Sequence, residues 1–174
     1  MDAPALSEAF DSARAESKGD TLHAMVDAET ETFTVGVFQD LAWAQKGVDA
    51  LKQAGFPAES LTILVKDSAD AAAFIERELG ASAMKVNLAG IGAAVGRGPL
   101  VTTLGTADLP KLGLARTMRR VGFQAHDGRI FDALTGRGGV LVAIQSIPRA
   151  ADALAILHSY GGGNAAIGAW AGRV

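Results

Sequence analysis

Residues 88–100, LAGIGAAVGRGPL, are where residue type and spacing come nearest to a binding chemistry. Glycines at the start of a helix let backbone N–H groups approach a phosphate. The dinucleotide-binding pattern G-x-G-x-x-G, however, needs its third glycine one position earlier than this segment has it. No Gly-Lys-Ser/Thr follows, so a Walker loop is excluded. The residues that would bind a ligand here are Gly90, Gly92, Gly96 and Arg97.

Close packing is the interpretation that we prefer for this segment. Gly92 and Gly96 are four positions apart, as on one face of a helix of small residues that another element can approach closely. Pro99 would end that helix. We therefore expect Gly92→Leu to destabilise the fold or its assembly by overpacking, and we keep phosphate or nucleotide binding as the alternative.

No residue pattern indicates catalysis or a metal. His23, His126 and His158 are far apart and show no paired ligand spacing. Ser146 precedes Pro148 as a helix cap would, without a general base nearby in the sequence. We expect no catalytic residue, no metal site, no cofactor and no enzymatic activity.

Three arginines form a weaker candidate site. Arg116, Arg119 and Arg120 fall within about one helical turn. They could hold a phosphate, a carboxylate or the acidic arm of a neighbour, although a solvated helix face is the simpler interpretation.

Composition limits the class of protein. The chain has 174 residues, of which 49% are hydrophobic, enough for one domain with a sizeable core. Its net charge of −3 shows no basic excess, so we expect no nucleic-acid partner. There is no cysteine, which excludes disulfides. The N-terminal residues resemble no signal peptide and no apolar run is long enough for a membrane span, so we expect a cytoplasmic protein without an integral membrane segment.

From residue 32 onwards the hydrophobic pattern predicts strand, helix, strand, helix. TFTVGVF alternates as a strand does, and LAWAQKGVDALKQA follows Asp40 as a capped helix. SLTILVKD is the next strand, and Ser68 opens the helix ADAAAFIEREL. The two strands should be parallel, with a right-handed crossover.

The same phrase returns near the C-terminus, where GVLVAIQSIPRAADALAILHSYG aligns without a gap to FTVGVFQDLAWAQKGVDALKQAG. NAAIGAW would be the last strand. We therefore expect an α+β fold of two related β-α-β units, in which residues 33–66 superpose on residues 139–170. The units should form a ferredoxin-like sheet with helices on one face and a Gly/Ala-rich helical insertion. The predicted divisions are an arm at 1–31 and a single domain at 32–174, made of a first unit (32–80), the insertion (81–122) and a second unit (123–174).

Two phrases carry a family resemblance. TVGVFQDLAWAQKGVDALKQAGFPAESLTILVKD and VGFQAHDGRIFDALTGRGGVLVAI resemble the bacterial general stress protein family, the heat-induced stress protein domain, over roughly residues 32–161. The resemblance implies a stress-associated or regulatory role in a bacterium and no specified chemistry. This sequence departs from the family in its middle, where charged residues and prolines interrupt a shortened apolar hairpin: Arg97, Pro99, Asp108 and Pro110.

One predicted helix, within RAADALAILHSYGG, is apolar on nearly every side. Such a helix is usually buried on more than one side, here by the glycine segment or by a second subunit. The interface residues would be Ala151 and Ala155, with His158 at the edge. Trp43 and Trp170 could be core residues or interface anchors.

We prefer a non-enzymatic, stress-associated interaction or structural module that forms a homo-oligomer. One alternative is a small-ligand or nucleotide-binding regulator that uses the glycine segment. The other is an accessory subunit that docks on a protein partner through residues 1–31, where ALSEAFDSARAESK could form a helix.

Overall fold

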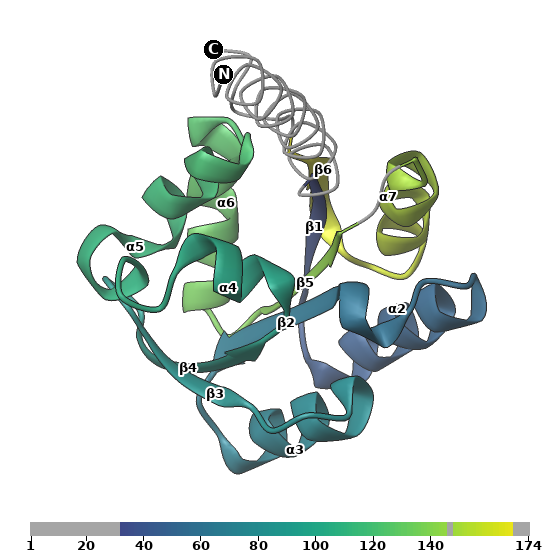
Figure 1. Cartoon of the computed structure of the whole chain (residues 1–174), viewed down its shortest axis with the longest axis horizontal. Helices are drawn as coiled ribbons and strands as arrows, with labels where there is room; N and C mark the ends of the chain where they lie inside the picture. Colours follow the sequence, from purple (N-terminus) through teal and green to yellow (C-terminus); the bar gives the residue numbers. More distant parts are fainter. Residues whose placement is uncertain (1–31, 146–147, 169–174) are drawn as a thin grey trace, which may run out of the picture.

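The computed structural model describes residues 32–145 and 148–168, and there six antiparallel strands form one sheet covered by six α-helices (Figure 1). The α+β class is therefore confirmed. The strands are β1 (Phe33–Phe38), β2 (Leu61–Lys66), β3 (Met84–Leu88), β4 (Gly92–Arg97), β5 (Val140–Gln145) and β6 (Gly163–Ile167). The helices are α2 (Leu41–Gln53), α3 (Ala69–Leu79), α4 (Pro99–Leu104), α5 (Leu109–Met118), α6 (Ala125–Gly136) and α7 (Ala150–Ser159), with short 3-10 turns η1 (Ala58–Ser60) and η2 (Arg119–Val121).

Local signals in the first unit place its elements where the sequence predicts them. The Asp40 carboxylate accepts a hydrogen bond from the Trp43 N–H at 2.9 Å and so caps α2. The Ser68 hydroxyl accepts from the Ala71 N–H at 3.0 Å and caps α3. Gly80, with φ of 66°, ends α3 in the left-handed conformation.

The two β-α-β units are interlocked. The strand order is β3-β4-β2-β5-β1-β6, and all neighbours are antiparallel. β5 lies between β1 and β2, which are therefore parallel to each other, as expected, but not paired. In the same way β1 lies between β5 and β6. Each unit thus supplies the strand that fills the gap in the other.

Helices cover both faces of the sheet, so the expectation of helices on one face is wrong. Figure 1 shows α4, α5 and α6 on one side and α2, α3 and α7 on the other. The physical reason is that the first five residues of β2 and of β5, LTILV and VLVAI, are apolar except for Thr62 and are buried on both faces. The helices after β4 supply the second cover with buried leucines: Leu100, Leu104, Leu109 and Leu114.

The glycine-rich segment is a β-hairpin and not the predicted helix of small residues. MKVNL forms β3, and β4 begins at Gly92. Gly90 and Gly92 lie at the turn, with φ of 81° and 101°. Overpacking at Gly92 was therefore a wrong expectation, because a Cβ added there would meet no atom within 4 Å. The cost of Gly92→Leu arises from the backbone conformation instead.

The close backbone approach lies at the other two glycines of the segment. A Cβ on Gly96 would lie 2.8 Å from Leu64 Cδ1. A Cβ on Gly98, where φ is 125°, would overlap the Leu61 carbonyl oxygen and lie 2.5 Å from Thr62 Cα. The next turn is fixed by the Leu100 N–H, which donates to the Thr62 hydroxyl at 2.9 Å. Glycine at position 98 is what lets β4 turn into α4 directly against β2.

The C-terminal unit repeats the order strand, helix, strand in β5, α7 and β6. The correspondence with the first unit ends at the glycine that follows each helix. After Gly55 the chain passes through η1 before β2 begins, whereas β6 begins two residues after Gly161. The last strand therefore starts earlier than a gapless alignment of residues 33–66 with 139–170 requires.

The ring of Phe38 occupies a socket made by two glycines. Phe38 is fully buried at the end of β1. A Cβ on Gly47 of α2 would overlap the ring, and one on Gly162, before β6, would lie 3.2 Å from Phe38 Cζ. Gly36 brings β1 equally close to the second unit, since its Cβ would lie 3.3 Å from the Gly162 carbonyl oxygen. These contacts join the first unit to the end of the second.

We expect Gly98→Ala to destabilise the fold by roughly 3 kcal/mol, because the methyl group would overlap β2 and the backbone conformation suits only glycine. Gly90→Ala is the matched control: it also lies at positive φ, but in open space. It should cost only about 1 kcal/mol. Urea unfolding followed by circular dichroism measures both variants. If both variants lost the same free energy of unfolding, the close approach of Gly98 to β2 would not contribute to stability.

Candidate functional site

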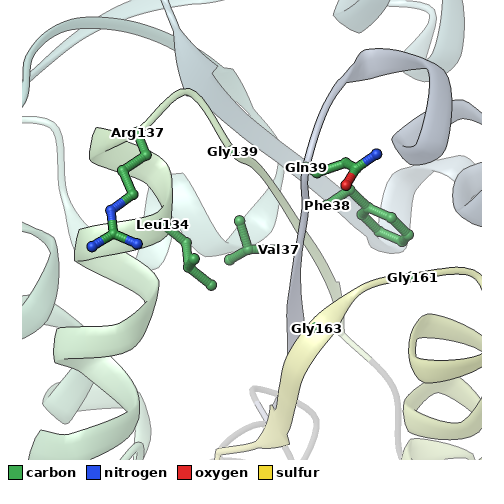
Figure 2. Close-up of a pocket in the computed structure, with 8 residues that line it drawn as sticks. All are labelled: Val37, Phe38, Gln39, Leu134, Arg137, Gly139, Gly161 and Gly163. Atoms are coloured by element: carbon green, nitrogen blue, oxygen red, sulfur yellow. The ribbon is translucent and has the colours of Figure 1, made fainter.

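One candidate site is an open hollow of about 370 Å³ at the carboxyl end of β1 (Figure 2). β1 contributes its last residues, α6 its last turn, and the chain before β6 a glycine-rich wall. The lining residues are Val37, Phe38, Gln39, Leu134, Arg137, Gly139, Gly161 and Gly163.

A β-bulge opens the sheet at this place. Val35 is paired with Ala166 and Val37 with Gly163, so one residue of β1 faces two residues of β6. Gly163 carries no side chain opposite Val37, and a Cβ there would meet no atom within 4 Å. The space beside Val37 is therefore left open.

Glycines are needed on both walls. A Cβ on Gly139 would lie 2.7 Å from both the Leu134 carbonyl oxygen and Val37 Cγ1. Gly161, with φ of 89°, lies against the ring of Trp43. Sequence reasoning missed this site because it concentrated on residues 88–100. The available signals were the glycine runs GRGGV and YGGGN, each of which lies directly before or at the start of a strand.

The polar side chains of the hollow are Gln39 and Arg137, both exposed. Figure 2 shows them on opposite sides of it, with Val37 and Leu134 between them. Within residues 32–145 and 148–168, neither side chain makes a hydrogen bond or ion pair to another residue. No carboxylate is among the lining residues. The site thus combines an apolar floor with one positive charge at its rim, which has no carboxylate partner among the described residues.

A second hollow, of about 450 Å³, begins at the next residue, Asp40, where α2 and α3 start. Its charges are mixed, because Lys66 lies with Asp40 and Asp67 in the lining. The Asp40 and Ser68 side chains already accept from the first N–H groups of the two helices. This hollow therefore offers an anion little unopposed positive charge.

The structure does not bring together the predicted ligand residues Gly90, Gly92, Gly96 and Arg97. Gly90 and Gly92 lie at one end of β4 and Arg97 at the other, a separation of roughly 17 Å for a strand of this length. Arg97 donates to the Ser82 carbonyl oxygen at 3.3 Å. The segment shapes the edge of the sheet and lines neither of the two hollows described above.

The predicted anion-binding arginines are all exposed, and one of them has a partner. Arg116 lies in α5, whereas Arg119 and Arg120 lie in η2. Arg120 Nη1 is 2.5 Å from Asp108 Oδ2. The hydrogen bond from Arg120, and then its charge, lower the pKa of Asp108 from its ordinary value of 3.8. Arg120 is thus already paired with a carboxylate at the surface of the protein.

Of the two covers expected for α7, the glycine segment is ruled out, and cover by a second subunit stays a prediction. Ala153 and Leu157 are its buried residues, whereas Ala151, Ala155 and His158 are exposed. The glycine segment does not cover α7, because β3 and β4 lie at the opposite end of the sheet from β6 (Figure 1). The predicted interface residues are therefore accessible in the single chain.

The remaining candidates add no site. His126 is exposed, and His23, Ser146 and Trp170 lie outside the described residues, as does the arm at 1–31. Among the residues that are described, no three His, Asp or Glu side chains are grouped to hold a metal ion. No helix within the same part of the chain has the length and hydropathy to cross a bilayer.

We expect Arg120→Gln to raise the pKa of Asp108 back towards its ordinary value, because the variant loses the charge that favours the carboxylate. Arg119→Gln is the matched control and should leave the pKa of Asp108 unchanged. Carbon-detected NMR titration of the Asp108 carboxyl measures both. A lowered pKa makes the pair stabilising at neutral pH, and this contribution is lost as pH falls through the lowered pKa. An unchanged Asp108 pKa in Arg120→Gln would contradict the assignment.

Comparisons of the chain with protein-family models, with curated proteins and with solved structures return no match. The function therefore has to be argued from the residues and geometry described above.

Proposed function

We propose that the protein is a non-enzymatic, stress-associated interaction module that self-associates through the outward side of α7. The single observation that carries the proposal is the exposure of Ala151 and Ala155 on that side, with no covering element in the described chain. The stress-associated role in a bacterial cytoplasm is supported by the resemblance to the general stress protein family.

The composition of this side suits contact with another protein. A helix that faces water usually carries charged or long polar side chains on its outer side. Small alanine side chains let a second helix approach closely, because the interaxial distance depends on the side chains at the contact.

Aromatic side chains lie at the C-terminal end of the same helix. Tyr160 is 41% exposed and Trp43 is 39% exposed, and the Trp43 ring packs beside Gly161. Aromatic residues are the usual anchors of protein interfaces, and this chain has few of them. Their exposure here supports α7 and the start of α2 as one continuous association surface.

A second copy of the chain is the occupant that fits best. α7 packs on β1 and β6, and β6 is an edge strand. Ile167 on β6 is 38% exposed. A two-fold axis beside this edge would place Ala151 and Ala155 of both copies together, with Asp152 and His158 at the margin, as an isologous interface requires.

The strand order supports the finer assignment of a ferredoxin-like arrangement. Without the β3–β4 hairpin, the order is β6-β1-β5-β2, in which two β-α-β units each enclose a strand of the other. On this proposal the hairpin and α4 to α6 are the insertion, and α7 lies at the free edge of the core.

Self-association is tested by placing a negative charge on the proposed surface. Ala155→Glu should weaken the dimer by about tenfold or more while the monomer stays folded, because each copy would bring a carboxylate to the same contact. Ala73→Glu is the matched control, since Ala73 is an exposed alanine on α3. Sedimentation velocity over a concentration series, with circular dichroism for folding, measures all three proteins.

Two results would overturn the proposal. One is a wild-type protein that remains monomeric at high micromolar concentration. The other is an Ala73→Glu variant that weakens association as much as Ala155→Glu does.

A further inference from the structure

We infer that the hollow at the end of β1 binds a small monoanion with an apolar body, of the class of medium-chain monocarboxylates. Arg137 would hold the carboxylate, and the floor formed by Val37 and Leu134 would hold the hydrocarbon. This site adjoins the proposed association surface, since Gly161 of its wall lies against Trp43, but its lining does not include Ala151 or Ala155 and the inference does not depend on self-association.

The volume and lining fit such a ligand. About 370 Å³ lies within the range of small-molecule sites, which are mostly apolar with a few polar groups that orient the ligand. Here Arg137 and Gln39 lie on opposite sides of the hollow (Figure 2). The hydrocarbon part of an amphiphilic ligand would be buried against Val37 and Leu134, and its charged end would stay at the rim.

Charge selects an anion. Arg137 is the charged residue of the lining, and a guanidinium forms paired hydrogen bonds with a carboxylate. The adjoining hollow has mixed charges, since Asp40 and Asp67 lie in its wall with Lys66. An anion is therefore favoured on the β6 side of the β1–α2 connection.

The backbone selects a monoanion over a phosphate. The N–H groups of the glycine wall already donate inside the fold, Gly139 to Leu134, Gly161 to His158 and Gly163 to Gly161. Phosphate-binding glycine loops have such donors free. One guanidinium and one amide are too few partners for a polyphosphate.

The open space at Gly163 provides a way to block the site. Gly163 is paired with Val37, and paired residues of antiparallel strands project to the same face of the sheet. A valine at position 163 would therefore project over Val37 into the hollow. Because a Cβ there meets no atom within 4 Å, the substitution should preserve the fold.

Octanoate is the probe, titrated into the full-length, isotope-labelled protein and followed by NMR. Backbone amide signals of Val37, Gly139 and Gly163 should shift together with a single dissociation constant. Uncharged 1-octanol should bind several-fold more weakly, because it cannot pair with the guanidinium. Inorganic phosphate should cause no shifts at these residues, because it has no apolar body.

Variants locate the binding. Arg137→Gln should weaken octanoate binding about five- to tenfold, and Arg137→Lys should recover part of the loss. Arg129→Gln, the same charge change at an exposed position of α6, should bind as the wild type does. Gly163→Val should abolish binding while circular dichroism shows an intact fold.

The inference is overturned if octanoate causes no shifts of the backbone amide signals of Val37, Gly139 and Gly163. It is also overturned if the Arg137→Gln variant binds octanoate as tightly as the Arg129→Gln variant does. Equal affinity for 1-octanol and octanoate would overturn the anion assignment. Because Arg137 is exposed, its variants test binding even if Gly163→Val fails to fold. A monomeric wild-type protein would contradict the proposed self-association and leave this test unaffected.

Discussion

The fold depends on the place of Phe38 between Gly47 and Gly162. Any side chain at either glycine would press on the buried ring, so this contact fixes how closely α2 and the start of β6 approach β1. β1 is also the strand on which the two β-α-β units meet, because it is paired with β5 on one side and β6 on the other. A change in this socket would move both units at once.

The hollow and the exposed side of α7 are two consequences of the same interlocking. β1 continues from Phe38 into Gln39, so the ring that closes the core also determines where the hollow begins. The glycine run that admits the ring ends α7 and starts β6 after a single short turn. That brief connection holds α7 over the edge of the sheet, with Leu157 inward and Ala155 outward.

The sequence predicted those parts of the fold that depend on neighbouring residues. The caps at Asp40 and Ser68, and the strand and helix that follow each of them in the first unit, result from local hydrogen bonding and periodicity. The glycine segment was assigned wrongly because glycines four apart fit a helix face and a hairpin equally well. Helices were expected on one face only, because the helices that cover the second face of β2 and β5 lie in the insertion, which was not predicted to pack on the sheet. The hollow combines residues near positions 37, 134 and 163, which no local pattern connects. The glycine segment was wrongly offered as a cover for α7, because the sequence does not show that β3 and β4 lie at the far end of the sheet from β6.

The pairing of β1 also determines when the sheet can form during synthesis of the chain. Phe33 is paired with Gln145 and Phe38 with Val140, so β1 leaves the ribosome about a hundred residues before its partner β5 does. Until then β1 and β2 have no neighbour between them, and their apolar residues and backbone groups remain available for wrong pairing. Contacts so distant in sequence are also slow to form. The sheet can therefore close only after β5 has been synthesised, and the nascent chain before that point is the form that most needs protection from aggregation.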